Sequence, residues 1–319
     1  MKVSKLLLVF LIPVLLIFAG CQTTNTEMQK DTLQGTVRVS GAFALYPMML
    51  KWAEEFQKVN PGVRIDVSAG GAGKGAADAL GGLVDLGMIS RSIKQEEIDQ
   101  GAYFVPVVKD AVFPAVNEKN PALNELLQKG IKKQVFIDLW INDKAMTWGE
   151  VAGASSTQKV VVYTRSDSCG AAETWAKYLK TGGLQEDLKG VGVYADPGIA
   201  EAVVKDALGI GYNNLNYAYD AKTGLPVAGM KVVPIDINEN GIVDENEKLD
   251  SKQMAIGSVR NGVYPSPPAR DLNLMTKGNF TGVTKEFVKW ILTDGQNYVE
   301  ETGYIKLTPM QIEDALKKV

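Results

Sequence analysis

Residues 36–47 of this chain read Thr-Val-Arg-Val-Ser-Gly-Ala-Phe-Ala-Leu-Tyr-Pro. The first five alternate between polar and apolar, as a half-buried strand does, and residues 47–59 place apolar side chains at helical spacing. The same order then recurs, with a strand expected at 63–67, a helix at 76–82 and a short buried strand at 84–88. This alternation predicts an α/β fold in which helices cover both faces of a parallel sheet.

Three glycine-containing turns, at residues 40–47, 70–75 and 165–171, each stand directly before an expected helix. The first turn of a helix exposes about four unpaired backbone N–H groups and carries roughly half a positive charge. Glycine lets an anion approach these groups because it has no Cβ. If the three turns surround one point together with Arg165, they would bind a small tetrahedral oxyanion without a metal or a catalytic group.

Each part of this interpretation has a simpler alternative. The turn at 70–75 lacks the glycine spacing and the Ser or Thr of an ATP-binding loop, so it would otherwise be an ordinary helix start. Lys74 adds positive charge to that turn and favours an anion. Arg165 could instead form an ion pair with Asp167 or Glu173. We favour the anion because an arginine beside a helix start can offer it two parallel hydrogen bonds.

Residues 236–247 fit the pattern of a calcium-binding loop, with Gly241 at the sharp turn. The oxygen ligands would be Asp236, Asn238, Asn240, the carbonyl of Ile242, Asp244 and Glu247. The alternative is a solvated acidic turn between strands. Because no clear EF-hand helix precedes this loop, we expect a structural calcium ion and not a calcium sensor.

Residues 1–20 are expected to be an export signal. Two lysines precede an apolar run at 6–18 that is too short for a comfortable membrane span. The run ends in Phe-Ala-Gly before Cys21, which resembles the cleavage site of bacterial lipoproteins, whose cysteine becomes lipidated. We therefore expect an exported protein, lipid-anchored to the membrane through Cys21, with residues 21–35 as a polar tether. An uncleaved signal anchor is the alternative.

The composition excludes several classes of function. The chain has 319 residues, 2 cysteines and no histidine. Without histidine there is no Ser-His-Asp or Cys-His catalysis and no histidine-ligated zinc. If Cys21 is acylated, Cys169 has no partner for an internal disulfide. A net charge of −3 without a basic block gives no support to nucleic-acid binding.

The chain beyond the tether is long enough for two lobes with separate cores. Residues 105–116 form one extended run that can leave one lobe and enter the other, and residues 253–262 could cross back. We therefore assign residues 36–112 and 256–319 to the first lobe and residues 113–255 to the second.

These motifs resemble those of the phosphate-binding lipoproteins of bacterial phosphate ABC transporters. The resemblance extends over nearly the whole mature chain and depends on the order and spacing of several short motifs. They are Ser40-Gly41 with Leu45-Tyr46-Pro47, Gly71-Ala72-Gly73-Lys74-Gly75, Val84-Asp85-Leu86-Gly87 with Ser90-Arg91, Trp148-Gly149-Glu150-Val151, Arg165 with Gly170, and Gly209-Ile210-Gly211-Tyr212.

The resemblance implies a periplasmic-binding-protein-like fold, in which two α/β lobes joined by a hinge close on a phosphate ion. The protein would be a monomer that passes the ion to an ABC permease and catalyses nothing. By position, the contacts with the ligand would come from Ala44, Leu45, Ala72, Gly73, Ser90, Arg165, Cys169, Gly170 and Ala171. The family usually carries hydroxyl side chains at the positions of Ala72, Cys169 and Ala171, and some members carry an aspartate in place of Ser90. Backbone donors survive these differences, so the anion site is better supported than the identity of the anion.

Three other functions stay open. The ligand could be another oxyanion such as sulfate, arsenate or tungstate. The chain could be a calcium-stapled surface enzyme that acts on phosphate esters, or a purely structural surface lipoprotein. The absence of histidine disfavours the enzyme.

Overall fold

The computed structural model describes residues 33–319. The chain divides into the units Met1–Thr32 and Leu33–Val319, and the second of them is described below. The expected export signal, Cys21 and nearly all of the tether therefore lie outside the described residues. Among residues 33–319, no helix has the length and apolar character needed to cross a membrane.

The strands of the described unit belong mostly to one mixed sheet. They are β1 (Gly35–Gly41), β2 (Val63–Ala69), β3 (Leu86–Ile89), β4 (Ala102–Asn117), β5 (Ile131–Lys132), β6 (Val161–Arg165), β7 (Val191–Val193), β8 (Gly209–Asn214), β9 (Met230–Val232), β10 (Ile235–Asp236) and β11 (Ala269–Lys277). The order in the sheet is β2-β1-β3-β11-β4-β8-β6-β7, with β9 also paired to β4, while β5 and β10 form a separate pair.

Helices connect these strands. They are α1 (Tyr46–Val59), α2 (Ala72–Leu80), α3 (Gln95–Asp99), α4 (Leu123–Lys129), α5 (Lys133–Trp140), α6 (Trp148–Ala152), α7 (Gly170–Leu179), α8 (Ala195–Lys205), α9 (Leu215–Ala218), α10 (Lys252–Arg260), α11 (Gly282–Leu292) and α12 (Pro309–Leu316), with short 3₁₀ turns η1 (Phe43–Leu45), η2 (Gln185–Asp187) and η3 (Asp294–Tyr298).

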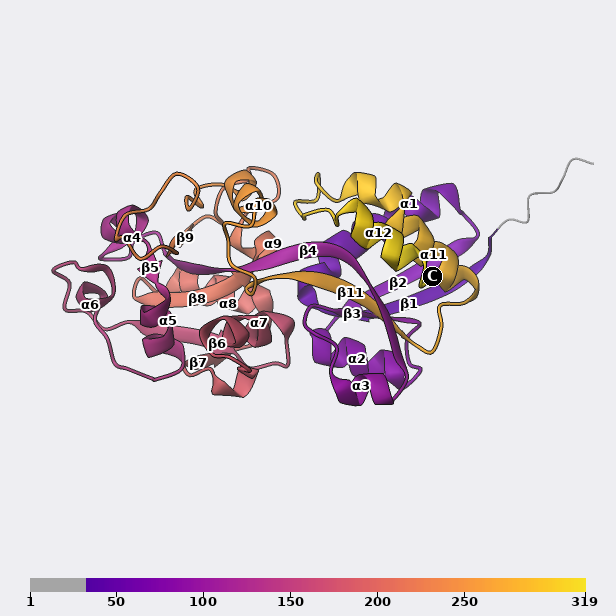
Figure 1. Cartoon of the computed structure of the whole chain (residues 1–319), viewed down its shortest axis with the longest axis horizontal. Coiled ribbons are helices and arrows are strands. Elements are labelled where there is room, and N and C mark those ends of the chain that lie inside the picture. The colour runs from indigo at the N-terminus through magenta and orange to yellow at the C-terminus, as the bar shows by residue number, and fades with distance from the viewer. Residues whose placement is uncertain (1–32) are drawn as a thin grey trace, which may run out of the picture. The chain divides into compact units, whose positions relative to one another are not determined.

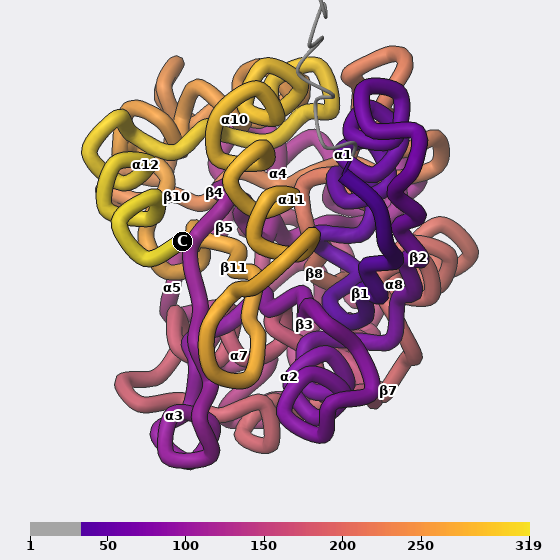
Figure 2. The backbone as a smooth tube through the Cα atoms, turned by 90° about the vertical axis from the view of Figure 1, so that its right-hand side faces the viewer, coloured from indigo at the N-terminus to yellow at the C-terminus, as the bar shows by residue number. Residues whose placement is uncertain are grey.

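The first lobe is built around the three strands that the opening pattern of the sequence predicts. β1 pairs in parallel with β2 on one side and with β3 on the other. Helices α1, α11 and α12 lie on one side of these strands and α2 on the other (Figure 1, Figure 2). The buried side chains of Trp52, Phe56 and Phe287 fill the core beneath α1 and α11, with the Phe56 and Phe287 rings 4.9 Å apart.

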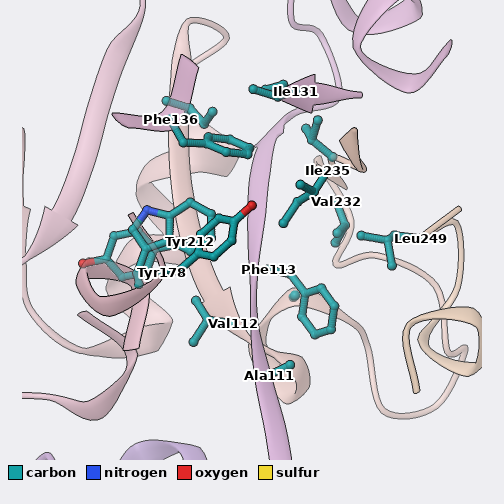
Figure 3. Close-up of a cluster of buried hydrophobic side chains, with 14 of the residues drawn as sticks. Ala111, Val112, Phe113, Ile131, Phe136, Tyr178, Tyr212, Val232, Ile235 and Leu249 are labelled. Carbon is teal, nitrogen blue, oxygen red and sulfur yellow. The ribbon is translucent and has the colours of Figure 1, made fainter. Parts of the chain in front are cut away.

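The second lobe has its own core, which lies on both faces of β4 (Figure 3). Strand β6 pairs in parallel with β7 and β8. On one side of β4, the ring of Trp175 from α7 stacks on that of Tyr212 from β8, with centroids 5.7 Å apart. The contact joins α7 to β8, and the Tyr212 hydroxyl in turn accepts a hydrogen bond from the Arg165 N–H at the end of β6 at 3.3 Å, where the third glycine turn begins.

Two antiparallel strands, β4 and β11, run between the lobes (Figure 1). Strand β4 pairs with β11 from Ala102 to Ala111 and with β8 from Val112 to Val116, so it changes partner between Ala111 and Val112. Strands β1, β2 and β3 are thus parallel to one another, as are β6, β7 and β8, whereas the crossing strands pair antiparallel with each other and with their neighbours β3, β8 and β9.

The return to the first lobe differs from the sequence-based expectation. Residues 253–262, expected to cross back, lie mainly in α10, whose Ala255 and Ile256 pack in the second-lobe core. The Ser251 hydroxyl starts this helix by accepting a hydrogen bond from the Met254 N–H at 3.3 Å. Strand β11 makes the crossing instead, so the second lobe extends past the boundary expected at residue 256.

Candidate anion-binding site

The three glycine turns come together where the lobes meet. The Gly73 N–H, from the second turn, points at the Ser168 carbonyl of the third at 3.4 Å. A Cβ on Gly170 would lie 2.0 Å from the Ser90 carbonyl oxygen, so the start of α7 packs directly on the segment after β3. The Tyr217 hydroxyl donates to the Phe43 carbonyl of the first turn at 3.3 Å. Turns that are far apart in the sequence thus surround one junction.

Most of the residues expected to contact the ligand are buried at this junction. They are Ala44, Leu45, Ala72, Ser90, Arg165, Cys169, Gly170 and Ala171, while Gly73 is partly exposed. Helix α2 begins at Ala72 and helix α7 at Gly170, so their first N–H groups are those that no carbonyl of the same helix can reach. Two helix starts, one from each lobe, therefore direct partial positive charge to the same region.

Cys169 stands at the N-cap of α7, where a hydroxyl is the usual cap. Its Sγ accepts a hydrogen bond from the Ala172 N–H at 3.4 Å, and its own N–H donates to Oε1 of Gln185 at 3.0 Å. Burial raises the pKa of the Cys169 thiol to about 12. The thiol is therefore neutral at physiological pH and adds no negative charge to the anion site.

Arg165 ends strand β6 and is 4% exposed. Its Nε donates to Asp167 Oδ1 at 2.8 Å and its Nη2 to Asp167 Oδ2 at 2.6 Å. The simpler alternative for Arg165, an ion pair with Asp167, is thus present in the structure. The other alternative, an ion pair with Glu173, does not form, because Glu173 pairs with Lys177 at 2.6 Å and with Arg91 at 3.5 Å.

The ion pair with Asp167 does not take Arg165 away from the junction. Its guanidinium carbon lies 5.9 Å from the centre of the Phe43 ring, which belongs to the first lobe. Its Nη1 lies 2.8 Å from Asp196 Oδ2, yet it makes no hydrogen bond of acceptable geometry. Burial disfavours the charged guanidinium, but attraction by Asp196 and Asp167 outweighs it, and the pKa of Arg165 is raised above its ordinary value. Arg165 is a fixed buried cation, held by Asp167 and Asp196.

Lys74 does not have the role that the sequence suggested for it. Its ammonium pairs with Asp78 one turn further along α2, and Asp78 also accepts a hydrogen bond from the Ser40 hydroxyl at 2.6 Å. The ion pair forms because residues four apart lie on the same side of a helix. The positive charge at the second turn is thus compensated locally, and the helix start itself remains the donor.

A second charged group, which sequence analysis missed, lies on the crossing strands. Arg270 of β11 donates from Nε to the Ser90 carbonyl at 2.7 Å, and its Nη2 lies 3.6 Å from Asp110 Oδ2 on β4. Asn214 joins this group to the first, because it accepts from Arg270 and donates to Asp196 Oδ1 at 2.5 Å. The available signal was the charged pair Lys109-Asp110, which interrupts the otherwise apolar run at 105–116.

Several buried polar atoms of this network make no hydrogen bond with any group in the described part of the chain. Asp110 Oδ2, Arg165 Nη1 and Arg270 Nη1 are inaccessible to solvent and make no hydrogen bond. Burial raises the pKa of Asp110 to about 6. A buried donor without an acceptor lowers the stability of the fold, so a bound ion or water commonly satisfies such a group. Arg270 Nη1 and the two helix starts are suited to an oxyanion, whereas Arg165 Nη1 lies against Asp196.

Comparison with known proteins agrees with this geometry. Residues 26–294 match the family described as a PBP superfamily domain. The chain belongs to the PBP superfamily. The two-lobe α/β fold expected from the sequence is thereby confirmed.

The individual relatives share a name. The chain is 28% identical to the phosphate-binding protein PstS of Bacillus subtilis, over 98% of this chain and 97% of the relative. It is 26% identical to the PstS of Methanocaldococcus jannaschii, over 91% and 87%. Among solved structures, a substrate-binding protein assigned to phosphate ABC transport from Clostridium perfringens, with bound phosphate, matches with a TM-score of 0.69 at 23% identity, over 86% of this chain and all of that one. At that identity the likeness supports the fold.

Proposed function

We propose that this chain is an extracytoplasmic solute-binding protein that captures phosphate between its two lobes and delivers it to an ABC permease. The observation that carries the proposal is the meeting of the glycine turns and the buried Arg165 where the two lobes touch. The similarity to proteins named phosphate-binding protein, over nearly the whole chain, supports it independently. Binding requires no bond to be made or broken.

Both lobes contribute donors, and this is how binding would be coupled to closure. The first lobe provides the starts of α1 and α2, and the second provides the start of α7 and Arg165. An anion between them contacts all four only when the lobes are together, so it favours the closed arrangement. Strands β4 and β11, which cross between the lobes, are where bending would occur.

The carboxylates at the junction favour phosphate over sulfate. Asp167 and Asp196 lie against Arg165, and Asp110 lies nearby in the same network through Asn214 and Arg270. Monohydrogen phosphate carries an O–H group that can donate a hydrogen bond to a carboxylate. Sulfate carries no O–H at neutral pH, so a carboxylate would repel it. Arsenate has the same protonation chemistry as phosphate, so its discrimination has to come from the size of the site.

The side chains at the turns suggest weaker binding than in a site lined with hydroxyls. Ala72, Cys169 and Ala171 offer no hydroxyl to the ligand. A hydrogen bond to a charged group is worth about 1.5–3 kcal/mol, so each missing donor matters. Backbone N–H groups and Arg165 would carry most of the affinity.

The remaining parts of the proposal concern location and partners. Cys21 would carry the lipid and hold the protein at the outer face of the cell membrane, where it would act as a monomer and meet the permease. Metabolic labelling with a radioactive fatty acid tests this, and loss of the label in Cys21→Ser with retention in Cys169→Ser is the expected result.

The binding function is tested by isothermal titration of the full chain in detergent against phosphate, sulfate, arsenate and tungstate. We expect micromolar or tighter binding of phosphate and much weaker binding of sulfate. Preference for sulfate or tungstate would replace phosphate by that ion. If no oxyanion binds and the protein instead hydrolyses a phosphate ester, the transport function is wrong.

A further inference from the structure

Residues 236–247, whose spacing predicts a calcium loop, lie in the second lobe between β10 and α10 and take no part in the junction. The loop ties several elements of that lobe together. The Val243 N–H donates to the Gln128 carbonyl of α4 at 2.8 Å, and the Ser258 hydroxyl of α10 donates to the Asn246 carbonyl at 3.2 Å. A ligand that stabilises the loop would therefore also stabilise the positions of α4 and α10.

The side-chain oxygens of the loop are turned toward its own backbone. Asp236 Oδ2 accepts from the Gly241 N–H at 2.9 Å. Asn238 Oδ1 accepts from the Asn240 N–H at 3.1 Å. Asn240 Oδ1 accepts from the Ile242 N–H at 2.8 Å. Each of these oxygens has a second lone pair that the hydrogen bond leaves available.

The observation that points to a ligand is that one carboxylate oxygen of Asp236 is buried and makes no hydrogen bond. Its side chain is 2% exposed, and its Oδ1 is buried without any hydrogen-bond partner. Since Oδ2 of the same carboxylate is held by Gly241 inside the loop, Oδ1 is confined to the loop as well. A buried carboxylate oxygen without a donor is costly, and a cation would compensate it.

The other two carboxylates of the proposed ligand set also make their hydrogen bonds within the loop. Glu247 is 4% exposed, and its two oxygens accept from the Ile237 and Asp244 N–H groups at 3.0 and 3.1 Å. It thereby joins the second and the ninth position of the loop. Asp244 Oδ2 accepts from the amides of Asn238 and Asn240 at 2.8 and 3.2 Å. The polar side chains of the loop thus contact one another across its width.

We propose that residues 236–247 bind one calcium ion through Asp236, Asn238, Asn240, Asp244, Glu247 and the carbonyl of Ile242. Among residues 33–319, no three Asp, Glu, Cys or His side chains are gathered as a metal-binding group, so the carboxylates of the loop would have to turn toward the ion when it binds, with amide and carbonyl oxygens completing the site. Calcium accepts such a mixed set of six to eight oxygens in flexible geometry, whereas magnesium demands near-ideal octahedral geometry and zinc prefers nitrogen and sulfur. The ion would brace the second lobe and leave the anion junction unaltered.

The test is thermal unfolding of the full chain in detergent, after treatment with EDTA and dialysis, with and without 1 mM calcium or magnesium. Calcium should raise the unfolding temperature of the wild type by a few degrees, because it binds the folded state alone. Magnesium should raise it much less. Equal stabilisation by both ions would overturn the assignment to calcium.

Two loop variants and one matched control locate the site. Glu247→Gln should abolish the calcium-dependent rise, and Asp244→Asn should reduce it if Glu247→Gln does not fold. Glu245→Gln is the control, because Glu245 lies in the same loop but has an 87% exposed side chain and pairs with Lys248. It should keep the full rise. Terbium luminescence of the wild type, excited through its aromatic residues and displaced by calcium, reads binding directly, and its absence at millimolar terbium would overturn the proposal.

Discussion

Two Arg-X-Asp pairs occur on strands of this protein, and they have opposite environments. On β2, Arg64 Nε lies 2.8 Å from Asp66 Oδ1, with side chains 74% and 46% exposed. At the end of β6, Arg165 makes two hydrogen bonds to Asp167, with side chains 1% and 9% exposed. The local sequence pattern is the same, so the difference comes from what packs around it.

The difference shows how an ordinary ion pair becomes part of a binding site. An exposed pair is solvated and contributes little to stability. The pair at Arg165 is enclosed by the first lobe through Phe43 and faces a second carboxylate, Asp196. Burial removes water from around the guanidinium, so its third nitrogen lies 2.8 Å from Asp196 and the positive charge is held in place where the lobes meet.

The largest expected effect comes from removing the buried arginine. Arg165→Ala should weaken phosphate binding at least tenfold, since a charged hydrogen bond is worth about 1.5–3 kcal/mol. It should also lower the free energy of unfolding by about 3–5 kcal/mol, because Asp167 and Asp196 become unpaired buried charges. Calorimetric titration and urea unfolding measure the two effects.

Arg64→Ala is the control for this comparison. It removes the same side chain from the same local pattern at the surface and should change phosphate affinity less than twofold. Unchanged affinity in Arg165→Ala would place the anion site elsewhere in the molecule.

The next effect is a pH dependence that only the buried network should show. Burial raises the pKa of Asp110 from 3.8 to about 6. Well below pH 3.8 the carboxyl is protonated in both states, and its contribution to stability is fully present. As the pH rises from 3.8 to about 6, the unfolded chain ionises before the folded one and this contribution is lost, by up to about 3 kcal/mol.

Asp110→Asn isolates this contribution because its side chain does not titrate. Between pH 4 and pH 7, its free energy of unfolding should rise relative to that of the wild type, as measured in urea at each pH. Asp66→Asn, on the exposed pair, should follow the wild-type profile. Parallel profiles for wild type and Asp110→Asn would show that Asp110 stays ionised and is compensated by Arg270.

A smaller effect is expected at the contact between the lobes. A Cβ at position 170 would lie 2.0 Å from the Ser90 carbonyl oxygen, so Gly170→Ala should hold the lobes apart and weaken phosphate binding about tenfold. Gly257→Ala is matched to it, since Gly257 lies in helix α10 with nothing within 4 Å of the added Cβ. The control should bind phosphate normally and unfold at the same or a higher temperature. Normal binding by Gly170→Ala would mean that the ligand does not need this closed contact.

The smallest expected effect is that of chelation on phosphate affinity. The loop at 236–247 contacts α4 and α10, whereas the anion junction is built from the starts of α2 and α7. Sites without shared partners usually act independently within about 0.5 kcal/mol, so EDTA should change the phosphate dissociation constant by roughly twofold or less. A tenfold change in the same titration would show that the loop and the junction are coupled.

Local patterns in the sequence were enough for much of this description. The alternation of strand, turn and helix in residues 36–88, the three glycine turns and the oxygen spacing at 236–247 depend on neighbours a few residues apart. Propensity and periodicity act over that range. The α/β fold and the position of Arg165 beside a helix start followed from them.

Only the tertiary structure decided which distant groups meet. It places Asp196 against Arg165, brings Asp110 and Arg270 together on the crossing strands, and returns the chain to the first lobe through β11 instead of residues 253–262. These pairings depend on which strands are neighbours in the sheet and on what burial leaves unpaired. Neither quantity is local, because a side chain's partners and its exposure are set by segments that lie from about thirty to more than a hundred residues away along the chain.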